Sequence, residues 1–429
     1  MVRPEPVRVS TRCQAAPSTV TGIARNRTRV LLSEGSSLTA REHLTVLGPA
    51  GVEVDMVSAV AQPLGRFSRW CGRVIRVPAV AQDPFGYLKA VSEVIGAGQY
   101  DALLPTHEQA WLFAAGRPLL PTDAPLAVAP IEAFDRVQSK VSFCELLDEL
   151  ALPQPSWSVV TTVADVAAVG FPCWMKSTYS TAGRGVRFID TRAVGEQAFV
   201  ELAGSGEQVL VQQPAPGAYA QAAGLFSRGR LIAVHTSEQL GVGAGGSAAA
   251  RIGVDHPEVR DHVARIGSHL RWHGGLTLDY LHVDGAPRYI ECNPRTVEPG
   301  NAAASGVDLP QLTIAISRGD RLPAATVMGR SGQRTHSAMA LMLGAAERTG
   351  RRGPALKALA TALARRGSYR DSREVLTPLR ADPLSALPIA ITSLQVLARP
   401  NRVGDIAASA VRGYSVPPSS VARVRVATG

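Results

Sequence analysis

An Asp-Gly turn between two alternating apolar runs is the feature of this sequence that most limits its possible folds. It lies within residues 276–295, Leu-Thr-Leu-Asp-Tyr-Leu-His-Val-Asp-Gly-Ala-Pro-Arg-Tyr-Ile-Glu-Cys-Asn-Pro-Arg. Asp-Gly favours the tight turn between antiparallel strands, so the stretch predicts a β-hairpin. Glu291 and Asn293 are two residues apart and share a strand face, and pairing can bring Asp279 opposite or diagonal to Glu291.

Three oxygen-bearing side chains on rigid strands make a candidate magnesium site. Mg²⁺ prefers hard oxygen ligands, and water and phosphate complete its shell when it serves a nucleotide. A polar strand face turned toward solvent is the alternative interpretation of Asp279, Glu291 and Asn293. The hairpin alone does not choose between the two.

Length and composition favour a globular protein of more than one domain. The chain has 429 residues, which predicts two or three domains, and its 45% apolar content includes only 5% aromatics. No apolar run is long enough to span a membrane, so no membrane association is expected. The cysteines are scattered and odd in number, which predicts reduced thiols in a cytoplasmic protein: Cys13, Cys71, Cys144, Cys173 and Cys292.

The net charge of +10 gathers at the two ends of the chain. Residues 1–30 hold six Arg and one acid, residues 330–429 hold sixteen Lys or Arg and five acids, and the middle is mildly acidic. Basic ends can attract nucleic acid or an anionic surface. They lack interleaved aromatics, a helix-turn-helix pattern and zinc spacing, so nucleic-acid binding is not favoured.

Residues 1–28 predict a disordered basic leader, because they are rich in Arg, Ser, Thr and Pro and have no periodic apolar pattern. They also lack the continuous apolar segment of a secretory signal. An organelle transit peptide and a flexible bacterial extension fit this composition equally well.

Residues 29–125 predict a small doubly wound domain. A strand, a helical crossover and a second apolar strand form a parallel βαβ unit, and the pattern repeats here. The expected elements are strands at 30–32, 52–57, 74–77 and 102–104, and helices at 38–47 and 84–95. The turn at 33–37 lacks a full dinucleotide fingerprint, so no NAD site is predicted there.

The next region carries two lysines and a glycine loop. Residues 131–150 predict one helix that contains Lys140, and an apolar strand at 172–176 ends on Lys176. The hydroxyl- and glycine-rich residues 177–186 follow. Small residues let backbone N–H groups approach an anion and a neighbouring lysine supplies charge, so this loop is a candidate phosphate lid. A plain hairpin turn is the alternative.

Two further segments are candidates for a role in binding. The glycine-rich run 241–247 is expected to form a mobile loop near the substrate. A helix at 257–272 carries His269, which has the i, i+4 spacing of a zinc pair with His273. No Glu follows His269 to complete the metalloprotease motif, so surface histidines are favoured over zinc.

The order of these features resembles the ATP-grasp superfamily of carboxylate–amine ligases. A helix lysine, a strand lysine, a glycine lid, a strand with a polar end, a glycine loop and an acidic hairpin ending in Glu-x-Asn-Pro-Arg follow one another. Gly245–Ser247, Arg251 and the Asn-Pro-Arg ending are most similar to the carbamoyl phosphate synthase ATP-binding domain and to amino-acid and peptide ligases.

The resemblance covers residues 29–320 and implies an α/β and α+β architecture. It divides the chain into a leader at 1–28, a Rossmann-like pre-ATP-grasp domain at 29–125, a two-subdomain ATP-grasp domain at 126–320, and a basic, partly helical C-terminal extension at 321–429. The extension carries no chemical motif. We expect it to cap the core or to form a homodimer surface.

The same resemblance implies a nucleotide site. Its lysines contact the α- and β-phosphates, residues 177–186 cover the phosphates, and the strand at 210–213 is the hinge whose backbone contacts adenine. The expected cofactor-binding residues are Lys140, Lys176, Ser177, Gly183, Gly185, Gln212 and Gln213. Gln212 replaces a glutamate found in many relatives, which leaves nucleotide preference open, and the ribose-binding acid is unassigned.

The hairpin supplies the other half of the implied site. Asp279, Glu291 and Asn293 match positions that hold two Mg²⁺ ions, with Mn²⁺ as an alternative, and Glu291 is the expected bridge. Arg295 matches the arginine that faces the transferred phosphoryl group. Arg295 and Lys176 are the expected catalytic residues.

The implied activity is that of an ADP-forming ligase. A carboxylate attacks the γ-phosphate of ATP to give an acyl phosphate, which an amine then displaces; this chemistry needs positioning and charge neutralisation more than a protein nucleophile. The expected partners are ATP and small, amino-acid or peptide-like carboxylate and amine substrates. A bicarbonate-phosphorylating enzyme, disfavoured by the lack of a biotinyl domain, and a non-catalytic nucleotide-binding protein are the alternatives.

Overall fold

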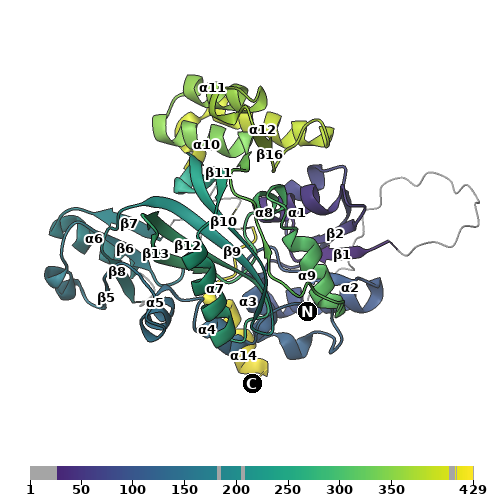
Figure 1. Ribbon diagram of the computed structural model, residues 1–429, viewed down its shortest axis with the longest axis horizontal. Helices are drawn as coiled ribbons and strands as arrows, with labels where there is room; N and C mark the ends of the chain where they lie inside the picture. Colours follow the sequence, from purple (N-terminus) through teal and green to yellow (C-terminus); the bar gives the residue numbers. More distant parts are fainter. Residues whose placement is uncertain (1–26, 181–184, 204–207, 405–410, 412, 429) are drawn as a thin grey trace, which may run out of the picture.

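Three β-sheets organise the chain in the computed structural model, which describes residues 27–180, 185–203, 208–404, 411 and 413–428. Figure 1 shows the N-terminal sheet on the right, the sheets of the middle of the chain on the left, and α10–α12 above them. The mixed α/β architecture predicted from the sequence is confirmed. Residues 1–26 of the expected leader and residues 181–184 of the expected lid lie outside the described residues.

The N-terminal sheet is parallel and has the order β3-β2-β1-β4, as the repeated βαβ pattern predicts. Val30, Leu31 and Leu32 of the inner strand β1 are apolar and fully buried, since helices cover both faces. The strands are β1 (Arg29–Leu32), β2 (Glu53–Ser58), β3 (Cys71–Arg76) and β4 (Ala102–Leu104), and the helices are α1 (Leu38–Leu47), α2 (Pro84–Gly98) and α3 (Gln109–Ala115).

The turn before α1 binds a carboxylate of its own chain. Glu34 is buried and accepts hydrogen bonds from the backbone N–H groups of Ser36 (2.5 Å) and Ser37 (3.0 Å) and from the hydroxyl of Thr106 (3.0 Å). Backbone N–H groups before a helix are the usual anion site of this kind of domain. Here Glu34 occupies them, which agrees with the missing dinucleotide fingerprint.

A second, antiparallel sheet has the order β5-β8-β6-β7. It consists of β5 (Trp157–Val160), β6 (Cys173–Ser177), β7 (Val186–Ile189) and β8 (Val209–Gln212), with α6 (Arg192–Leu202) packed against β6 and β7. Its inner face forms a separate apolar core that includes Met175, Ile189 and Val211.

The helix predicted at 131–150 is in fact two helices, α4 (Ile131–Asp135) and α5 (Lys140–Glu149). The prediction was wrong because the apolar spacing continues across a new helix start. The side chain of Ser139 accepts a hydrogen bond from the backbone N–H of Ser142 and caps α5. Lys140 is therefore the first residue of α5.

The largest sheet has the order β13-β12-β9-β10-β11-β15-β16, with β14 paired to β10. Its strands are β9 (Ala218–Ser227), β10 (Arg230–Val242), β11 (Ala248–Val254), β12 (Gly274–Val283), β13 (Ala286–Asn293), β14 (Val327–Met328), β15 (Arg334–His336) and β16 (Ser372–Glu374). Helix α7 (Pro257–His269) packs on β9 and β10. Helices α8 (Pro299–Ala304) and α9 (Leu309–Arg318) lie between this sheet and the N-terminal domain (Figure 1).

The glycine-rich run at 241–247 has regular structure in place of the irregular loop expected. β10 continues to Val242, a 3₁₀ turn covers Ala244–Gly246, and β11 follows at once. The Gln239 side chain donates to the carbonyl oxygens of Gly246 and Ser247, and Gly245 N–H donates to Glu347 at 2.7 Å. These bonds tie the run to α10 (Ala338–Thr349).

The C-terminal region packs against the N-terminal helices at two separate places. Helices α10, α11 (Arg352–Leu363) and α12 (Ala386–Ala398) pack together, and α14 (Pro418–Thr428) returns to pack on α3 and α2 (Figure 1). Buried Arg41 of α1 forms an ion pair with buried Asp382 at 2.7 Å. Within the described ranges, no helix is long and apolar enough to cross a membrane.

Candidate functional site

The hairpin predicted around the Asp-Gly turn is present, with β12 and β13 joined by Asp284 and Gly285. Both residues have positive φ angles, 49° and 75°, as the mirror-image turn of a two-residue hairpin requires. The register pairs Asp279 directly with Glu291 and Thr277 with Asn293. The three oxygen-bearing side chains therefore lie on the same face.

Asp279 is held by amide donors on both carboxylate oxygens. Gln221 of β9 donates to Oδ1 and Asn293 donates to Oδ2, each at 3.0 Å. Burial and the charge of Glu291 raise the pKa of Asp279 to about 6, although the Gln221 hydrogen bond lowers it. Two adjacent carboxylates on paired strands repel each other, and a bound cation would relieve that repulsion.

The negative charge of Glu291 is balanced by Lys140, which lies far from it in the sequence. The Lys140 ammonium lies 3.0 Å from Glu291 Oε1 and donates to the hydroxyl and carbonyl oxygens of Ser180 at 3.1 and 3.2 Å. Burial favours a raised pKa for Glu291, but Lys140 and then Lys176 reverse the effect and leave the pKa below its ordinary value. Glu291 is therefore ionised under physiological conditions.

Lys176 lies one step behind this pair. Its ammonium donates to Gln212 Oε1 at 2.7 Å and to the carbonyl oxygen of Ile290 at 3.3 Å. Burial lowers its pKa to about 8, with Glu291 opposing and Lys140 adding to the shift. The side-chain nitrogen of Gln212 is buried and has no hydrogen-bond partner among the described residues, so a donor for a ligand is left at the hinge.

A cavity of about 980 Å³ runs between the sheets and receives most of the predicted site. The predicted residues that line it are Lys140, Ser177, Gly185, Asp279, Glu291, Asn293 and Arg295. Lys176 and Gln212 lie behind its wall, and the Gln213 side chain turns away to donate to the carbonyl oxygen of Gly170. Gly183 lies outside the described residues.

The strands on either side of the lid, β6 and β7, pair in antiparallel fashion, and Ser177 N–H donates to the carbonyl oxygen of Gly185 at 2.8 Å. Gly185 lies close to two other residues of the lid, Ser177 and Ser180. A Cβ at this position would lie 2.5 Å from Ser180 Cβ and 2.9 Å from Ser177 Cβ. Only glycine fits there without a shift of the loop.

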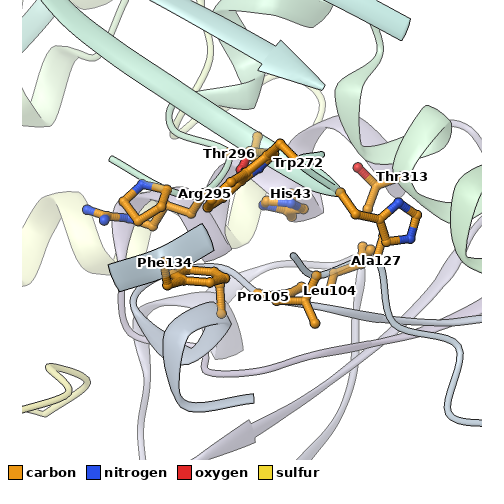
Figure 2. Close-up of a pocket in the computed structure, with 14 residues that line it drawn as sticks. His43, Leu104, Pro105, Ala127, Phe134, Trp272, Arg295, Thr296 and Thr313 are labelled. Carbon is orange, nitrogen blue, oxygen red and sulfur yellow. The ribbon is translucent and has the colours of Figure 1, made fainter. Parts of the chain in front are cut away.

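Arg295 follows the hairpin and lines a second, small cavity of about 20 Å³, enough for one water molecule. Figure 2 shows its guanidinium group directed away from His43 and Thr313. Its Nε is buried without a hydrogen-bond partner among the described residues. Burial and then the charge of Arg295 lower the pKa of His107 well below its ordinary value, so a neutral imidazole faces this arginine.

Several residues of the cavity wall were not predicted from the sequence. Gln221, Tyr219, Glu298, Val411 and residues 414–418 line it, as do Met339 and Leu343 of α10. Buried Arg251 pairs with Glu298 at 2.6 Å. Glu298 has a φ of 48°, which is rare for a residue with a side chain. Its position three residues after Arg295 is the sequence feature that could have suggested it as a residue of the cavity wall.

The candidate zinc pair is not formed. His269 Nε2 lies 3.2 Å from Glu149, while His273 Nδ1 accepts a hydrogen bond from the backbone N–H of Arg228 at 3.3 Å.

The donor set of the hairpin fits magnesium. Asp279, Glu291 and Asn293 offer carboxylate and amide oxygens, which are hard donors, and they lie beside lysines suited to phosphate. The ionised state of Glu291 and the mutual repulsion of the two carboxylates favour a divalent cation at this point.

Known proteins match part of this chain. A search of protein-family models found no match. The chain is 26% identical over 224 residues to the carbamoyl phosphate synthase large chain of Thermomicrobium roseum, and 24% identical over 213 residues to the arginine-specific large chain of Geobacillus stearothermophilus. These matches cover 46% of this chain and 20% of each relative, so the chain spans about a fifth of the curated relatives' length.

Solved structures show the same fold at low sequence identity. Phosphoribosylamine–glycine ligase of Thermotoga maritima matches with a TM-score of 0.55 at 14% identity, over 72% of this chain and 80% of that chain. An L-amino acid ligase of Bacillus licheniformis matches with a TM-score of 0.52 at 16% identity, over 69% and 75%. The biotin carboxylase domain of Hydrogenobacter thermophilus 2-oxoglutarate carboxylase, solved with MgADP and bicarbonate, matches with a TM-score of 0.54 at 14% identity, over 72% and 73%.

Proposed function

We propose, from the premise that this chain has the ATP-grasp fold, that it is an ATP- and Mg²⁺-dependent ligase that joins a carboxylate to an amine. The observation that carries the proposal is the convergence of Lys140, Asp279, Glu291 and Arg295 on one cavity. The cavity wall therefore carries both cationic side chains, which suit phosphate, and anionic side chains, which suit a metal ion.

The lysines and the lid would hold the nucleotide. Lys140 and Lys176 would neutralise its phosphates, the lid from Ser177 to Val186 would cover them, and the hinge at Gln212 and Gln213 would contact adenine. The unpartnered Gln212 nitrogen supports a hydrogen bond to the base, although its oxygen already accepts from Lys176. The Gln213 side chain is turned away, so only its backbone is suited to contact adenine.

The hairpin would hold the metal. Asp279, Glu291 and Asn293 would bind two magnesium ions, or manganese in their place, with Glu291 between them. Bound metal ions would supply charge neutralisation of the transferred phosphoryl group. Arg295, whose Nε has no partner among the described residues, would face that group.

The reaction would proceed without a protein nucleophile. A carboxylate oxygen of the substrate would attack the γ-phosphate of ATP and release ADP, and an amine would then displace phosphate from the acyl phosphate. Positioning and electrostatic stabilisation supply the rate enhancement in such transfers. Within this scheme we retain the division into a leader, a pre-ATP-grasp domain at 29–125, an ATP-grasp domain at 126–320 and an extension at 321–429.

The proposal is tested by ADP release with Mg²⁺ across amino-acid mixtures, with bicarbonate alone as a separate arm. An amino-acid- and magnesium-dependent signal would support the ligase. A bicarbonate-dependent signal would instead favour a carboxylase-type reaction, which the likeness to biotin carboxylases keeps as the second candidate. ATP binding with no ADP release from any mixture would indicate a non-catalytic nucleotide-binding protein.

A variant pair makes the test specific to the site. Glu291→Gln should abolish ADP release and leave the far-UV circular dichroism unchanged, since loss of one such electrostatic contact costs about 3 kcal/mol in the transition state. Glu132→Gln, on the exposed face of α4, is the matched control and should keep full activity. Unchanged turnover in Glu291→Gln would contradict the assignment.

A further inference from the structure

The face of the large sheet opposite the candidate site carries a second cluster of metal-ligating side chains. Asp279 faces the cavity, and because side chains alternate along a strand, Tyr280 and His282 of β12 face the other way. Glu238 of β10 is paired with Ala220 of β9, which is paired with Tyr280. Glu238 therefore stands in the same row, on the face that α7 covers.

His256 completes this cluster from the residue before α7. Among the residues that the structure describes, Glu238, His256 and His282 form the group of three whose ligand atoms all lie within 4.8 Å of one another. The imidazole rings of His256 and His282 are stacked with centroids 3.5 Å apart. His256 Nε2 lies 3.7 Å from Glu238, and His282 Nε2 lies 2.8 Å from Glu258, a fourth oxygen donor on α7.

We propose that Glu238, His256 and His282, with Glu258 as a fourth donor, form a binding site for a divalent transition-metal ion of the zinc type. Two imidazoles and one or two carboxylates are a donor set that zinc binds in tetrahedral geometry. The site would link β10, β12 and the start of α7. It is separate from the magnesium donors on the opposite face of the sheet.

The surroundings of His256 have the form expected around a metal-ligating histidine. Its Nδ1 lies 2.9 Å from the hydroxyl of buried Tyr280, which orients the ring and leaves Nε2 toward Glu238. The side chain of His256 is only 10% exposed and that of His282 only 11%.

The charge of the cluster also favours a cation. Among the described residues, the ion-pair partners of Glu238 and Glu258 within 4.0 Å are these histidines and no Lys or Arg. Two carboxylates without a Lys or Arg partner make this cluster a place where a cation would be favoured. Because an imidazole binds metal in its ring plane, one ring must turn out of the parallel stack on binding, and the 2.8 Å contact between His282 and Glu258 would then open.

Metal analysis of the full-length protein tests the proposal. The untagged protein is stripped with chelator and dialysed against one equivalent of Zn²⁺ in excess Mg²⁺, which occupies the hard oxygen site. We expect close to one zinc per chain, and Co²⁺ in its place should give the visible absorption of a tetrahedral site. A wild-type protein that retains no zinc would overturn the proposal.

Variants locate the ion. Glu238→Gln and His256→Gln should each weaken zinc binding at least tenfold, and the double variant His256→Gln/His282→Gln should abolish it. His269→Gln/His273→Gln removes two other histidines of the same region and should leave binding unchanged. Equal zinc binding in the wild type and the His256→Gln/His282→Gln variant would refute the site.

A thermal readout separates a loss of fold from a loss of ligand. Zinc should raise the melting temperature of the wild type but not of Glu238→Gln, which keeps a similar shape and lacks the charge. Magnesium-dependent ADP formation should be the same with and without zinc, because none of these residues lines the ATP cavity. The two proposals can therefore fail independently.

Discussion

At the scale of single residues, the candidate site holds two ionisable groups whose pKa values are displaced toward neutrality from opposite sides. The pKa of Asp279 is raised to about 6 by burial and by Glu291, and that of Lys176 is lowered to about 8 by burial. Asp279 is charged above its pKa and Lys176 below its pKa, so the two groups are charged at the same time only between about 6 and about 8. The sequence predicted which residues these are, but not their pKa values, since burial, the largest cause of both shifts, arises only when distant segments pack together.

Asp279 predicts the acidic limit of activity. As the pH falls through about 6, the carboxyl group gains a proton and no longer binds Mg²⁺, so kcat/KM for ATP should fall. Glu291, whose pKa is lowered, stays ionised over this range. A pH profile at several Mg²⁺ concentrations checks this, because excess Mg²⁺ should shift the limit to lower pH; a limit independent of Mg²⁺ would contradict it.

Lys176 predicts the alkaline limit. As the pH rises through about 8 the ammonium loses its proton, and the KM for ATP should rise because a positive charge that would neutralise the phosphates from behind the cavity wall is lost. Lys176→Met should lower kcat/KM at pH 7 about a hundredfold and remove the alkaline limb. Lys89→Met, on the exposed surface of α2, serves as the control and should keep the wild-type profile.

At the scale of elements, local signals were sufficient where a turn or a cap lies within a few residues. The Asp-Gly hairpin and the βαβ elements were predicted because their patterns are short and self-contained. The break at Ser139 was missed because the apolar spacing runs across it. Strands β14, β15 and β16 have two or three residues each, and such short runs carry no periodic pattern.

The lid predicts a sharp effect of one methyl group. Gly185→Ala places a Cβ 2.5 Å from the Cβ of Ser180, so the two residues must move apart. That movement would displace Ser180, whose hydroxyl accepts a hydrogen bond from Lys140. The KM for ATP should rise about tenfold or more, since small displacements at a phosphate site are costly. Steady-state kinetics measures this.

Gly96→Ala is the matched control for the lid variant. Gly96 lies in α2, and a Cβ there would meet nothing within 4 Å. The control should keep wild-type kinetics and gain up to about 1 kcal/mol in the free energy of unfolding. If both variants bound ATP like the wild type, the lid would have no role in nucleotide binding.

At the scale of the whole molecule, the C-terminal region contributes to the wall of the cavity that holds the candidate site. Val416 N–H donates to Glu108 at 3.2 Å, and Gln109 donates to the carbonyl oxygen of Tyr414 at 2.7 Å. The sequence of this region has no chemical motif, so its place in the wall was not predictable. Its residues act by shape and by contacts that exist only after long-range folding.

The buried pair between Arg41 and Asp382 predicts how strongly the two ends depend on each other. Both side chains are 0% exposed, and Asp382 also accepts from the backbone N–H of Arg69 at 2.9 Å. Asp382→Ala leaves a buried guanidinium without its carboxylate, so the free energy of unfolding should fall by about 3–5 kcal/mol. Denaturant unfolding measures the loss.

The exposed pair between Arg425 and Asp135 is the control for this prediction. Its atoms are 2.8 Å apart, but the side chains are 46% and 40% exposed. Asp135→Ala should cost less than about 1 kcal/mol. The pKa of Asp382 is lowered, with Arg69 and Arg41 outweighing the effect of burial, so the stabilisation by the buried pair is lost only as the pH falls through that lowered pKa.

In the proposed site, the contact between Lys140 and Glu291 would make nucleotide and metal binding thermodynamically linked. Metal alone would take the carboxylate and leave the buried ammonium uncompensated, while nucleotide alone would take the ammonium and leave its phosphates beside two carboxylates. Binding of both satisfies every charge. Each ligand should therefore tighten the other by the same factor, so free ATP and free Mg²⁺ are each weak ligands of a site that binds their complex well.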